Sequence, residues 1–191
     1  MQYGITSEHL AIAAYERHQG LEHGTVKKVG LMISLEDGVL GACPDGLIGE
    51  DGLLEIKCPY SIRNFKPEEW PSLAPGNSSL TLKSGSLQLK KSHNHYYQVV
   101  MQIYVTGRDW GDYVVWTPNG IYVERIFRDE NTLGVWVELR EKLLKFWEED
   151  LAVELVDSRE RRKSKEFLCS DERKIGRDRN LARNAKTANA N

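Results

Sequence analysis

The 191-residue sequence lacks the features that mark membrane, secreted and disulfide-stabilised proteins. No stretch approaches the roughly 18 consecutive apolar residues that a membrane-spanning helix needs. The N-terminal segment MQYGITSEHL has neither the basic nor the apolar region of a secretory signal. The cysteines, Cys43, Cys58 and Cys169, form an odd set without regular spacing. These absences predict an intracellular protein in a reducing compartment, with no membrane contact.

Zinc-ligand spacing is also missing. Structural zinc sites place their ligands in close pairs such as C-x₂-C and H-x₃₋₅-H. His93 and His95 are separated by a single residue, and Cys43 and Cys58 lie far apart in the chain. The sequence therefore argues against a zinc centre.

The net charge of −2 conceals an uneven distribution along the chain. Residues 158–191 carry 11 Lys/Arg against 5 Asp/Glu, a net of +6, which leaves 15 against 23, or −8, for residues 1–157. The basic segment is either a non-specific phosphate-binding element or a solvated disordered end. We predict one domain over 1–157 and a disordered, net basic tail over 158–191. Its Arg161-Arg162-Lys163 run is compatible with a nuclear address, although such runs are common.

The strongest functional signal lies in residues 40–60, which contain GACPDGLIGEDGLLEIKCPY. Residues 49–52, Gly-Glu-Asp-Gly, form a strong turn signal between two apolar segments. We therefore expect Asp45 to end one strand and Glu55 and Lys57 to lie on the next. Because side chains alternate along a strand, Glu55 and Lys57 share one face and their apolar neighbours the other.

Two carboxylates on neighbouring strands can share a hard cation. Mg²⁺ prefers octahedral oxygen ligands and usually takes one or two protein carboxylates. A lysine beside such an ion can orient the attacking water and offset charge on a phosphate. The alternative is a surface hairpin on which Glu55 and Lys57 pair across solvent. We favour the site, because the polar pair interrupts an apolar strand after a Pro-Asp-Gly turn.

These residues also carry a family resemblance. Residues 44–46 (Pro-Asp-Gly) and 54–59 (Leu-Glu-Ile-Lys-Cys-Pro) resemble the PD-(D/E)xK nuclease signature. The surrounding residues are similar to the lambda-exonuclease-like family, also called the YqaJ viral recombinase domain, over roughly the first 150 residues. The phrase SLQLKKSHNHYYQ resembles animal-encoded members more than the phage enzyme. The resemblance implies a metal-dependent deoxyribonuclease of recombination or repair, most simply an exonuclease.

The resemblance also implies roles for single residues. Asp45, Glu55 and the backbone carbonyl of Ile56 would bind Mg²⁺ or Mn²⁺, and Lys57 would position the nucleophilic water. Residues 4–8 are similar to the family's Gly-x-x-x-Glu, whose glutamate reaches into the metal site, which implicates Glu8.

Glu8 has a second interpretation within the first predicted helix. Thr6 or Ser7 can cap this helix, which ends near Gly20. A glutamate in the first turn is a favourable partner for the helix dipole. A role in stabilising the helix, without any role in the metal site, is therefore the alternative for Glu8.

Two glutamines lie one turn apart on the helix predicted over residues 93–106. The family pattern is Gln-x-Gln-x-Gln. Gln98 and Gln102 match its first and third positions, whereas Val100 replaces the middle glutamine, which usually lies at the active centre. The resemblance implies Gln98 as a site residue, and the departure would weaken activity or transfer part of the role to Gln98. The alternative is a pair of solvent-facing glutamines.

The order of the predicted elements indicates an α/β layer fold, with a mixed central β-sheet flanked by helices. This agrees with the restriction-endonuclease-like fold that the resemblance implies. We expect strands over 31–35, 39–42, 113–117 and 121–127, a hairpin over 80–91, and mostly loop over 65–84. On the 93–106 helix we expect Tyr97, Met101 and Tyr104 to face inward. A final helix over 131–151 carries an apolar stripe that is expected to face the core and consists of Leu133, Trp136, Val137, Leu143, Leu144, Trp147 and Leu151.

The resemblance also suggests partners. Phage members degrade duplex DNA from 5′ ends as ring-shaped trimers and work with an annealing protein, which implies DNA ends, a homo-oligomer and an annealing partner. Their phosphate-recognising segment before the first helix has no expected counterpart ahead of Gly4, so the resemblance does not settle 5′-end selectivity or ring assembly. The chief alternative is an inactive or weakly active relic that acts as a DNA-binding or protein-interaction module. A third is an interaction protein that uses the apolar stripe.

Overall fold

The computed structural model describes residues 2–163, so most of the tail predicted over 158–191 lies outside the described residues. The chain forms two compact units, Met1–Leu139 and Arg140–Asn191. No helix within 2–163 is long and apolar enough to cross a membrane.

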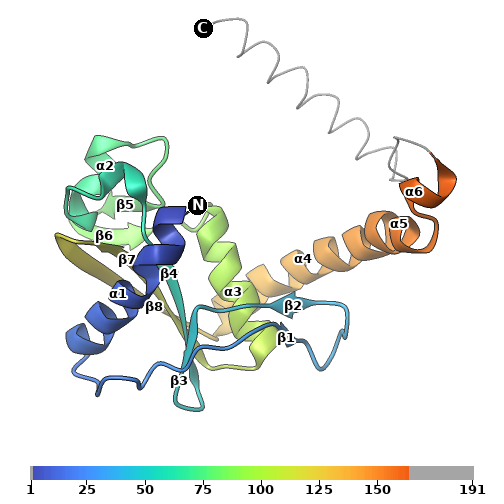
Figure 1. Ribbon diagram of the computed structural model, residues 1–191, viewed down its shortest axis with the longest axis horizontal. Coiled ribbons are helices and arrows are strands. Elements are labelled where there is room, and N and C mark those ends of the chain that lie inside the picture. The colour runs from blue at the N-terminus through green and yellow to red at the C-terminus, as the bar shows by residue number, and fades with distance from the viewer. Residues whose placement is uncertain (1, 164–191) are drawn as a thin grey trace, which may run out of the picture. The chain divides into compact units, whose positions relative to one another are not determined.

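Four strands form the central sheet of the first unit, in the order β3-β4-β7-β8 (Figure 1). They are β3 (Gly46–Ile48), β4 (Gly52–Lys57), β7 (Trp110–Thr117) and β8 (Gly120–Phe127). β4 pairs antiparallel with β3 and parallel with β7, and β7 pairs antiparallel with β8. The predicted mixed sheet is therefore confirmed.

The start of β4 depends on a close approach between a glycine and an aromatic ring. Gly52 pairs with Trp110 in the parallel register of β4 and β7. A Cβ on Gly52 would lie 2.2 Å from a carbon of the Trp110 ring. Only glycine leaves room for the indole here, so the end of the predicted 49–52 turn is fixed by packing as well as by turn chemistry.

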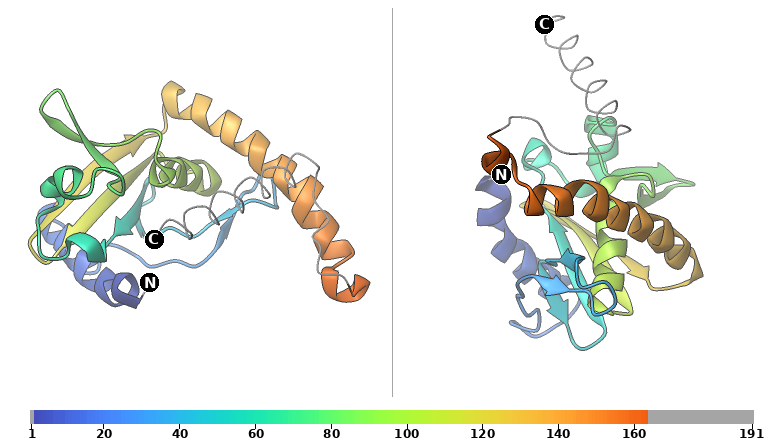
Figure 2. Two further views of the ribbon diagram at one scale, coloured as in Figure 1. Left: turned by 90° about the horizontal axis from the view of Figure 1, so that it is seen from above. Right: turned by 90° about the vertical axis from the view of Figure 1, so that its right-hand side faces the viewer.

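Helices cover both faces of the sheet (Figure 2). On one face lies α1 (Gln2–His18), and its buried Ala11 and Tyr15 join a core cluster with the sheet. On the other lies α3 (Asn94–Thr106), packed so closely that a Cβ on Gly111 would be 2.9 Å from Val99. The core cluster on the α1 face comprises Ala11, Tyr15, Val26, Ile48, Leu54, Ile56 and Val114.

The start of α1 differs from the prediction. The helix begins at Gln2, so Thr6 and Ser7 are internal residues and not caps. Thr6 Oγ1 donates back to the carbonyls of Gln2 and Tyr3, and Ser7 is buried. Glu8 therefore lies beyond the first turn, and the expected role as a first-turn dipole partner is wrong.

The inward face of α3 also differs. The helix bounds are close to the prediction, and His93 is its cap, with Nδ1 accepting from His95 N. Tyr97 is 38% exposed, so its expected inward position is wrong, whereas Met101 and Tyr104 are partly buried. The buried positions are Tyr96, Val99, Val100, Gln102, Ile103 and Val105.

Two small hairpins lie outside the central sheet. β1 (Met32–Ile33) pairs with β2 (Gly41–Ala42), both shorter than predicted. β5 (Leu80–Lys83) pairs with β6 (Ser86–Leu89), as expected.

The segment between β4 and β5 is not only loop. It holds two 3₁₀ helices, η1 (Tyr60–Ile62) and η2 (Pro67–Glu69), and the short helix α2 (Trp70–Leu73). Pro67 and Pro71 lie at the first turns of η2 and α2, where a missing N–H is harmless. Two prolines of the segment predicted to be mostly loop thus lie at the starts of helices.

The final helical segment departs from the prediction in continuity and in burial. α4 (Glu130–Phe146) is followed by a π-helical turn, η3 (Trp147–Leu151), and then by α5 (Ala152–Val156) and α6 (Arg159–Arg162). Of the predicted stripe, Trp136 is buried and stacks on Tyr104. Leu133, Val137 and Leu151 are 48%, 58% and 41% exposed, so the expectation that the whole stripe faces the core is wrong.

Candidate active site

The turn before β3 brings Asp45 onto β4. Asp45 N donates to the carbonyl of Leu54 at 3.0 Å, and its Oδ2 accepts from Ile56 N at 2.6 Å. Asp45 therefore precedes β3 and does not end a strand, which corrects the prediction. The hydrogen bond to Ile56 fixes the carboxylate beside the backbone that carries Glu55.

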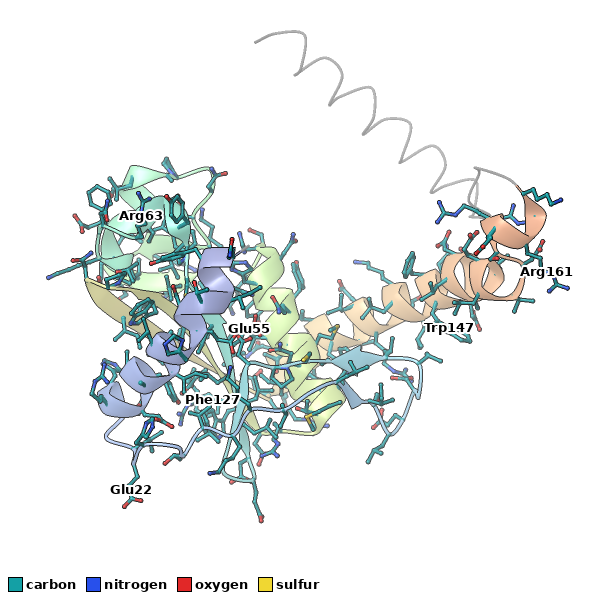
Figure 3. All side chains as sticks on the ribbon, in the orientation of Figure 1. Glu22, Glu55, Arg63, Phe127, Trp147 and Arg161 are labelled. Carbon is teal, nitrogen blue, oxygen red and sulfur yellow. The ribbon has the colours of Figure 1, made fainter. Side chains whose placement is uncertain are left out.

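Glu55 is a buried carboxylate that projects from β4 beside α3 (Figure 3). Its Oε1 accepts from Lys57 Nζ and, at 2.7 Å, from Gln98 Nε2. Its Oε2 accepts from Gln102 Nε2 at 2.6 Å. Charge-assisted hydrogen bonds of this kind hold the carboxylate in one orientation.

Lys57 lies on the same face of β4 as Glu55, as the alternation predicted. Its side chain is 24% exposed, and Nζ donates to Glu55 Oε1 and to Gln98 Oε1, the latter at 3.1 Å. Lys57, Glu55 and Gln98 thus form a closed set of hydrogen bonds. The alternative of a hairpin pair exposed to solvent is wrong, because Glu55 is only 2% exposed.

The glutamines face the site and not solvent. Gln98 and Gln102 both donate to Glu55 from one face of α3. Because each residue of an α-helix is turned by about 100° from the one before, Val100 lies on the opposite side of α3 from the two glutamines, where it is fully buried. Gln102 Oε1 is buried and has no hydrogen-bond partner within the described part of the chain.

Glu8 approaches the site from α1 without a direct hydrogen bond to it among the contacts described. Lys28 Nζ donates to Glu8 Oε1 at 2.7 Å, and the glutamate side chain is 27% exposed. Its charge is still felt at the site. Burial, with Asp45 and Glu8 as neighbouring negative charges, raises the pKa of the Cys58 thiol to about 12.

The electrostatics of the site favour a cation. Burial raises the pKa of Asp45 to about 6, and the negative charges of Glu55 and, more weakly, Glu8 act in the same direction. The N–H of Ile56 and the charge of Lys57 oppose the rise. A positive ion between the carboxylates would relieve this repulsion.

The donor set fits a hard metal ion. Within residues 2–163, no group of three or more His, Cys, Asp and Glu side chains is gathered closely enough to hold a metal by itself. Mg²⁺ and its relatives need only one or two carboxylates and fill their other positions with water, carbonyl and phosphate oxygens. Asp45 and Glu55 would supply the carboxylates, and the unpartnered Gln102 Oε1 is a further buried oxygen near Glu55. The Ile56 carbonyl stays a predicted ligand.

Three further residues near this set carry little signal in the sequence. Lys28 binds Glu8, Tyr113 pairs with Glu55 in the β4–β7 register, and His95 Nδ1 lies 2.8 Å from the Tyr113 hydroxyl. Tyr113 stands in an apolar run that predicts only a buried strand.

Comparisons with known proteins point to one family. Residues 1–109 match the family model described as the YqaJ-like viral recombinase domain, a range that includes all the predicted site residues. No curated protein matches the chain significantly.

Solved structures also match, seven chains in all. The crystal structure of an alkaline exonuclease, LHK-Exo from Laribacter hongkongensis, is 27% identical, with 78% of this chain and 72% of that chain covered and a TM-score of 0.48. LHK-Exo in complex with dAMP is 26% identical, with 81% of this chain and 74% of that chain covered and a TM-score of 0.53. The likeness to the complex supports the predicted restriction-endonuclease-like layer fold.

Proposed function

The chain belongs to the YqaJ-like viral recombinase domain family, and we propose that it is a metal-dependent deoxyribonuclease that hydrolyses DNA phosphodiester bonds. One observation carries the proposal: Asp45, Glu55 and Lys57 meet at one end of β4, in a setting that raises the pKa of Asp45 to about 6, chiefly through burial. Crowded carboxylates with an adjacent lysine suit metal-assisted phosphoryl chemistry.

Asp45 and Glu55 are the proposed ligands of Mg²⁺ or Mn²⁺, with the Ile56 carbonyl and Glu8 as further ligands. When bound, such an ion polarises the scissile phosphate and stabilises the leaving 3′ oxygen. For Glu8 to take part, its carboxylate must exchange the 2.7 Å bond to Lys28 for the ion. No covalent intermediate is required.

Lys57 is proposed to orient the nucleophilic water and to offset charge on the phosphate. Its ammonium group is held by Glu55 and Gln98, which leaves one of its three N–H donors for water or phosphate. Gln98 and Gln102 in turn hold Glu55 from both oxygens. The two glutamines therefore serve the reaction through the carboxylate that they position.

An exonuclease is the most specific version of this proposal. The similar LHK-Exo is an alkaline exonuclease, and its structure with dAMP contains a deoxynucleoside monophosphate. We extend this activity to the present chain on double-stranded DNA ends, in recombination or repair. Four further statements stay predictions: a homo-oligomer, an annealing-protein partner, a domain over 1–157 with a disordered tail, and an intracellular or nuclear location.

The alternative is a weakly active or inactive relic that binds DNA or protein. Val100 favours it, because a buried valine stands where the family's middle glutamine is expected. The hydrogen bonds of Gln98 and Gln102 to Glu55 favour the enzyme.

The first test is hydrolysis of linear duplex DNA with a 5′-phosphate, in Mg²⁺ and then in EDTA. Lys57→Ala is the test variant, and Lys83→Ala, which removes an exposed lysine from β5, is the matched control. The proposal expects metal-dependent degradation by the wild type and by Lys83→Ala, and its loss in Lys57→Ala. A covalently closed circular substrate then separates exonuclease from endonuclease.

A metal titration separates enzyme from relic. Mg²⁺ that binds only the folded state raises the unfolding temperature, and Asp45→Ala should abolish that rise. The nuclease proposal would be wrong, and the relic would take its place, if the folded wild-type protein showed no hydrolysis in Mg²⁺ or Mn²⁺ and no metal-dependent stabilisation.

A further inference from the structure

A chain of hydrogen bonds runs from the interior of the protein to the edge of the candidate site. Ser79 Oγ lies 2.9 Å from the Tyr113 hydroxyl, which lies 2.8 Å from His95 Nδ1. Ser79 and Tyr113 are fully buried, whereas His95 is partly exposed. The proton positions along these hydrogen bonds can be assigned from the buried end.

Either hydroxyl of the Ser79–Tyr113 pair can be the donor, and the acceptors available at the buried end favour one arrangement. Within the described part of the chain, the Tyr113 oxygen is the side-chain partner of the Ser79 hydroxyl. A buried hydroxyl donates its proton wherever an acceptor is available, so Ser79 donates to Tyr113. The Tyr113 proton then goes to its other neighbour, His95 Nδ1. His95 Nδ1 is therefore an acceptor, and the ring proton of the neutral imidazole is on Nε2.

The ring is also fixed in place. His93 meets His95 edge to face with ring centroids 4.4 Å apart, and the Tyr113 ring lies 5.7 Å away on a tilted plane. His95 N donates to His93 Nδ1, which ties the backbone to the same pair of rings. Burial, followed by the positive charge of Lys57, lowers the pKa of His95 to about 3. The imidazole is thus neutral as well as oriented.

The location of His95 connects it with the site. Tyr113 is the register partner of Glu55, so both side chains lie on the same face of the sheet. His95 precedes Gln98 by three residues on α3, which places it on the same side of the helix. Nε2 lies across the ring from Nδ1 and therefore points away from buried Tyr113. Among residues 2–163, no hydrogen-bond partner of Nε2 is found.

We propose that His95 is a DNA-binding residue of the site, whose neutral imidazole donates its Nε2–H to a phosphate oxygen of the substrate strand beside Lys57. The proposal rests on the proposed nuclease function for its substrate. A neutral donor adds a directed hydrogen bond without placing a second positive charge against Lys57. His95 cannot serve as the general base in this arrangement, because Nδ1 is occupied and Nε2 already carries the proton.

DNA affinity tests the proposal without relying on cleavage. Binding of a fluorescent duplex is measured in EDTA at one fixed salt concentration, since phosphate contacts depend on salt. His95→Phe keeps a ring and removes the donor, and His95→Gln places an amide N–H near the position of Nε2. We expect the dissociation constant to rise about tenfold for His95→Phe, and His95→Gln to recover most of the affinity.

Tyr113→Phe tests the relay, by which we mean the hydrogen bonds from Ser79 through Tyr113 to His95. It should release His95 Nδ1 and weaken binding by a smaller factor than His95→Phe. Its matched control is Tyr122→Phe, which removes a hydroxyl bonded to Glu124 and Leu87 and leaves the relay intact. The ¹⁵N chemical shifts of His95 give an independent readout: the wild type should show protonated Nε2 and unprotonated Nδ1, and Tyr113→Phe should change that balance.

The outcomes separate this proposal from the nuclease. If the wild type binds DNA in EDTA but does not cut it in Mg²⁺, and His95→Phe weakens binding, the proposed nuclease function is wrong and the proposed role of His95 stands. Wild-type affinity in a folded His95→Phe protein, a proton on Nδ1, or no DNA binding by the wild type would each overturn the role of His95.

Discussion

Gln102 of α3 donates a 2.6 Å hydrogen bond to Glu55 of β4, although the two residues are 47 positions apart in the sequence. Gln102 is 1% exposed, so its amide is buried in order to reach the carboxylate. Together with the bond from Gln98 to the other oxygen, it sets the orientation of Glu55 from the helix. The geometry of the proposed metal site therefore depends on the packing of α3 against the sheet.

Gln102→Leu should weaken metal binding without removing a ligand from the carboxylate pair. Loss of a group that orients a metal ligand typically lowers metal affinity or activity by about 10- to 100-fold. We expect the Mg²⁺ concentration for half-maximal DNA hydrolysis to rise within that range. Gln88→Leu, the same change at an exposed position of β6, is the control. Equal Mg²⁺ requirements in the two variants would show that Gln102 does not position Glu55.

Val100→Gln should not restore the family pattern. Val100 is fully buried on a part of α3 that does not face Glu55, so a glutamine there would bury an unpaired amide. We expect the free energy of unfolding to fall by roughly 1–3 kcal/mol, as measured by urea denaturation, with no gain in hydrolysis. A variant of wild-type stability that cleaves DNA faster would mean that this position can turn toward the site.

The hairpin that carries Asp45, Glu55 and Lys57 was predictable because its signals are local. Alternation along a strand places Glu55 and Lys57 on one face, and the Gly-rich turn at 49–52 sets the reversal. The position of Asp45 was less predictable. Its backbone N–H donates to the carbonyl of Leu54 and its carboxylate accepts from Ile56 N, and both contacts depend on how the segment before β3 lies along β4.

Side chains that break the hydrophobic pattern were not predictable from it. The buried face of α3 includes Gln102, which periodicity alone assigns to solvent, and leaves Tyr97 38% exposed. Leu133 and Val137 show the converse, because apolar residues at helical spacing on α4 are exposed. Hydrophobic periodicity identifies helices, whereas the partners that cover or pair each face come from distant parts of the chain.

Asp112 should be a major contributor to stability because it joins α1 to two strands. This fully buried carboxylate accepts two 2.8 Å bonds from Arg125 and a 2.6 Å bond from Tyr15. Asp112→Ala leaves the guanidinium unpaired, and we expect a loss of about 3 kcal/mol, the lower end of the range for a broken buried pair. The lower end applies because the Arg125 side chain is 39% exposed.

Chemical denaturation checks this expectation, with Asp51→Asn, at an exposed position in the 49–52 turn, as a control that should change stability by less than about 0.5 kcal/mol. Tyr15→Phe should fall between the two, since it removes only the neutral donor. If Asp112→Ala unfolds at the wild-type denaturant concentration, the network does not hold α1 to the sheet.

Glu16 should make stability depend on pH. Although burial acts to raise the pKa of Glu16, the N–H groups of Val26 and Gly24 and the side chain of His23 lower it below the ordinary value of 4.5. The folded protein thus binds the Glu16 proton less tightly than the unfolded chain. The resulting stabilisation is fully present above pH 4.5 and is lost as the pH falls through the lowered folded-state pKa.

Glu16→Gln keeps the shape of the side chain and removes its charge. We expect it to lower the free energy of unfolding by about 1–2 kcal/mol at pH 7, and by progressively less as the pH approaches 3. Urea denaturation at a series of pH values measures the difference, and Glu22→Gln, at an exposed position after α1, is the control. A difference from wild type that is the same at pH 7 and pH 3 would show that shape, and not the charge accepted by Val26 and Gly24, ties the end of α1 to the chain that follows it.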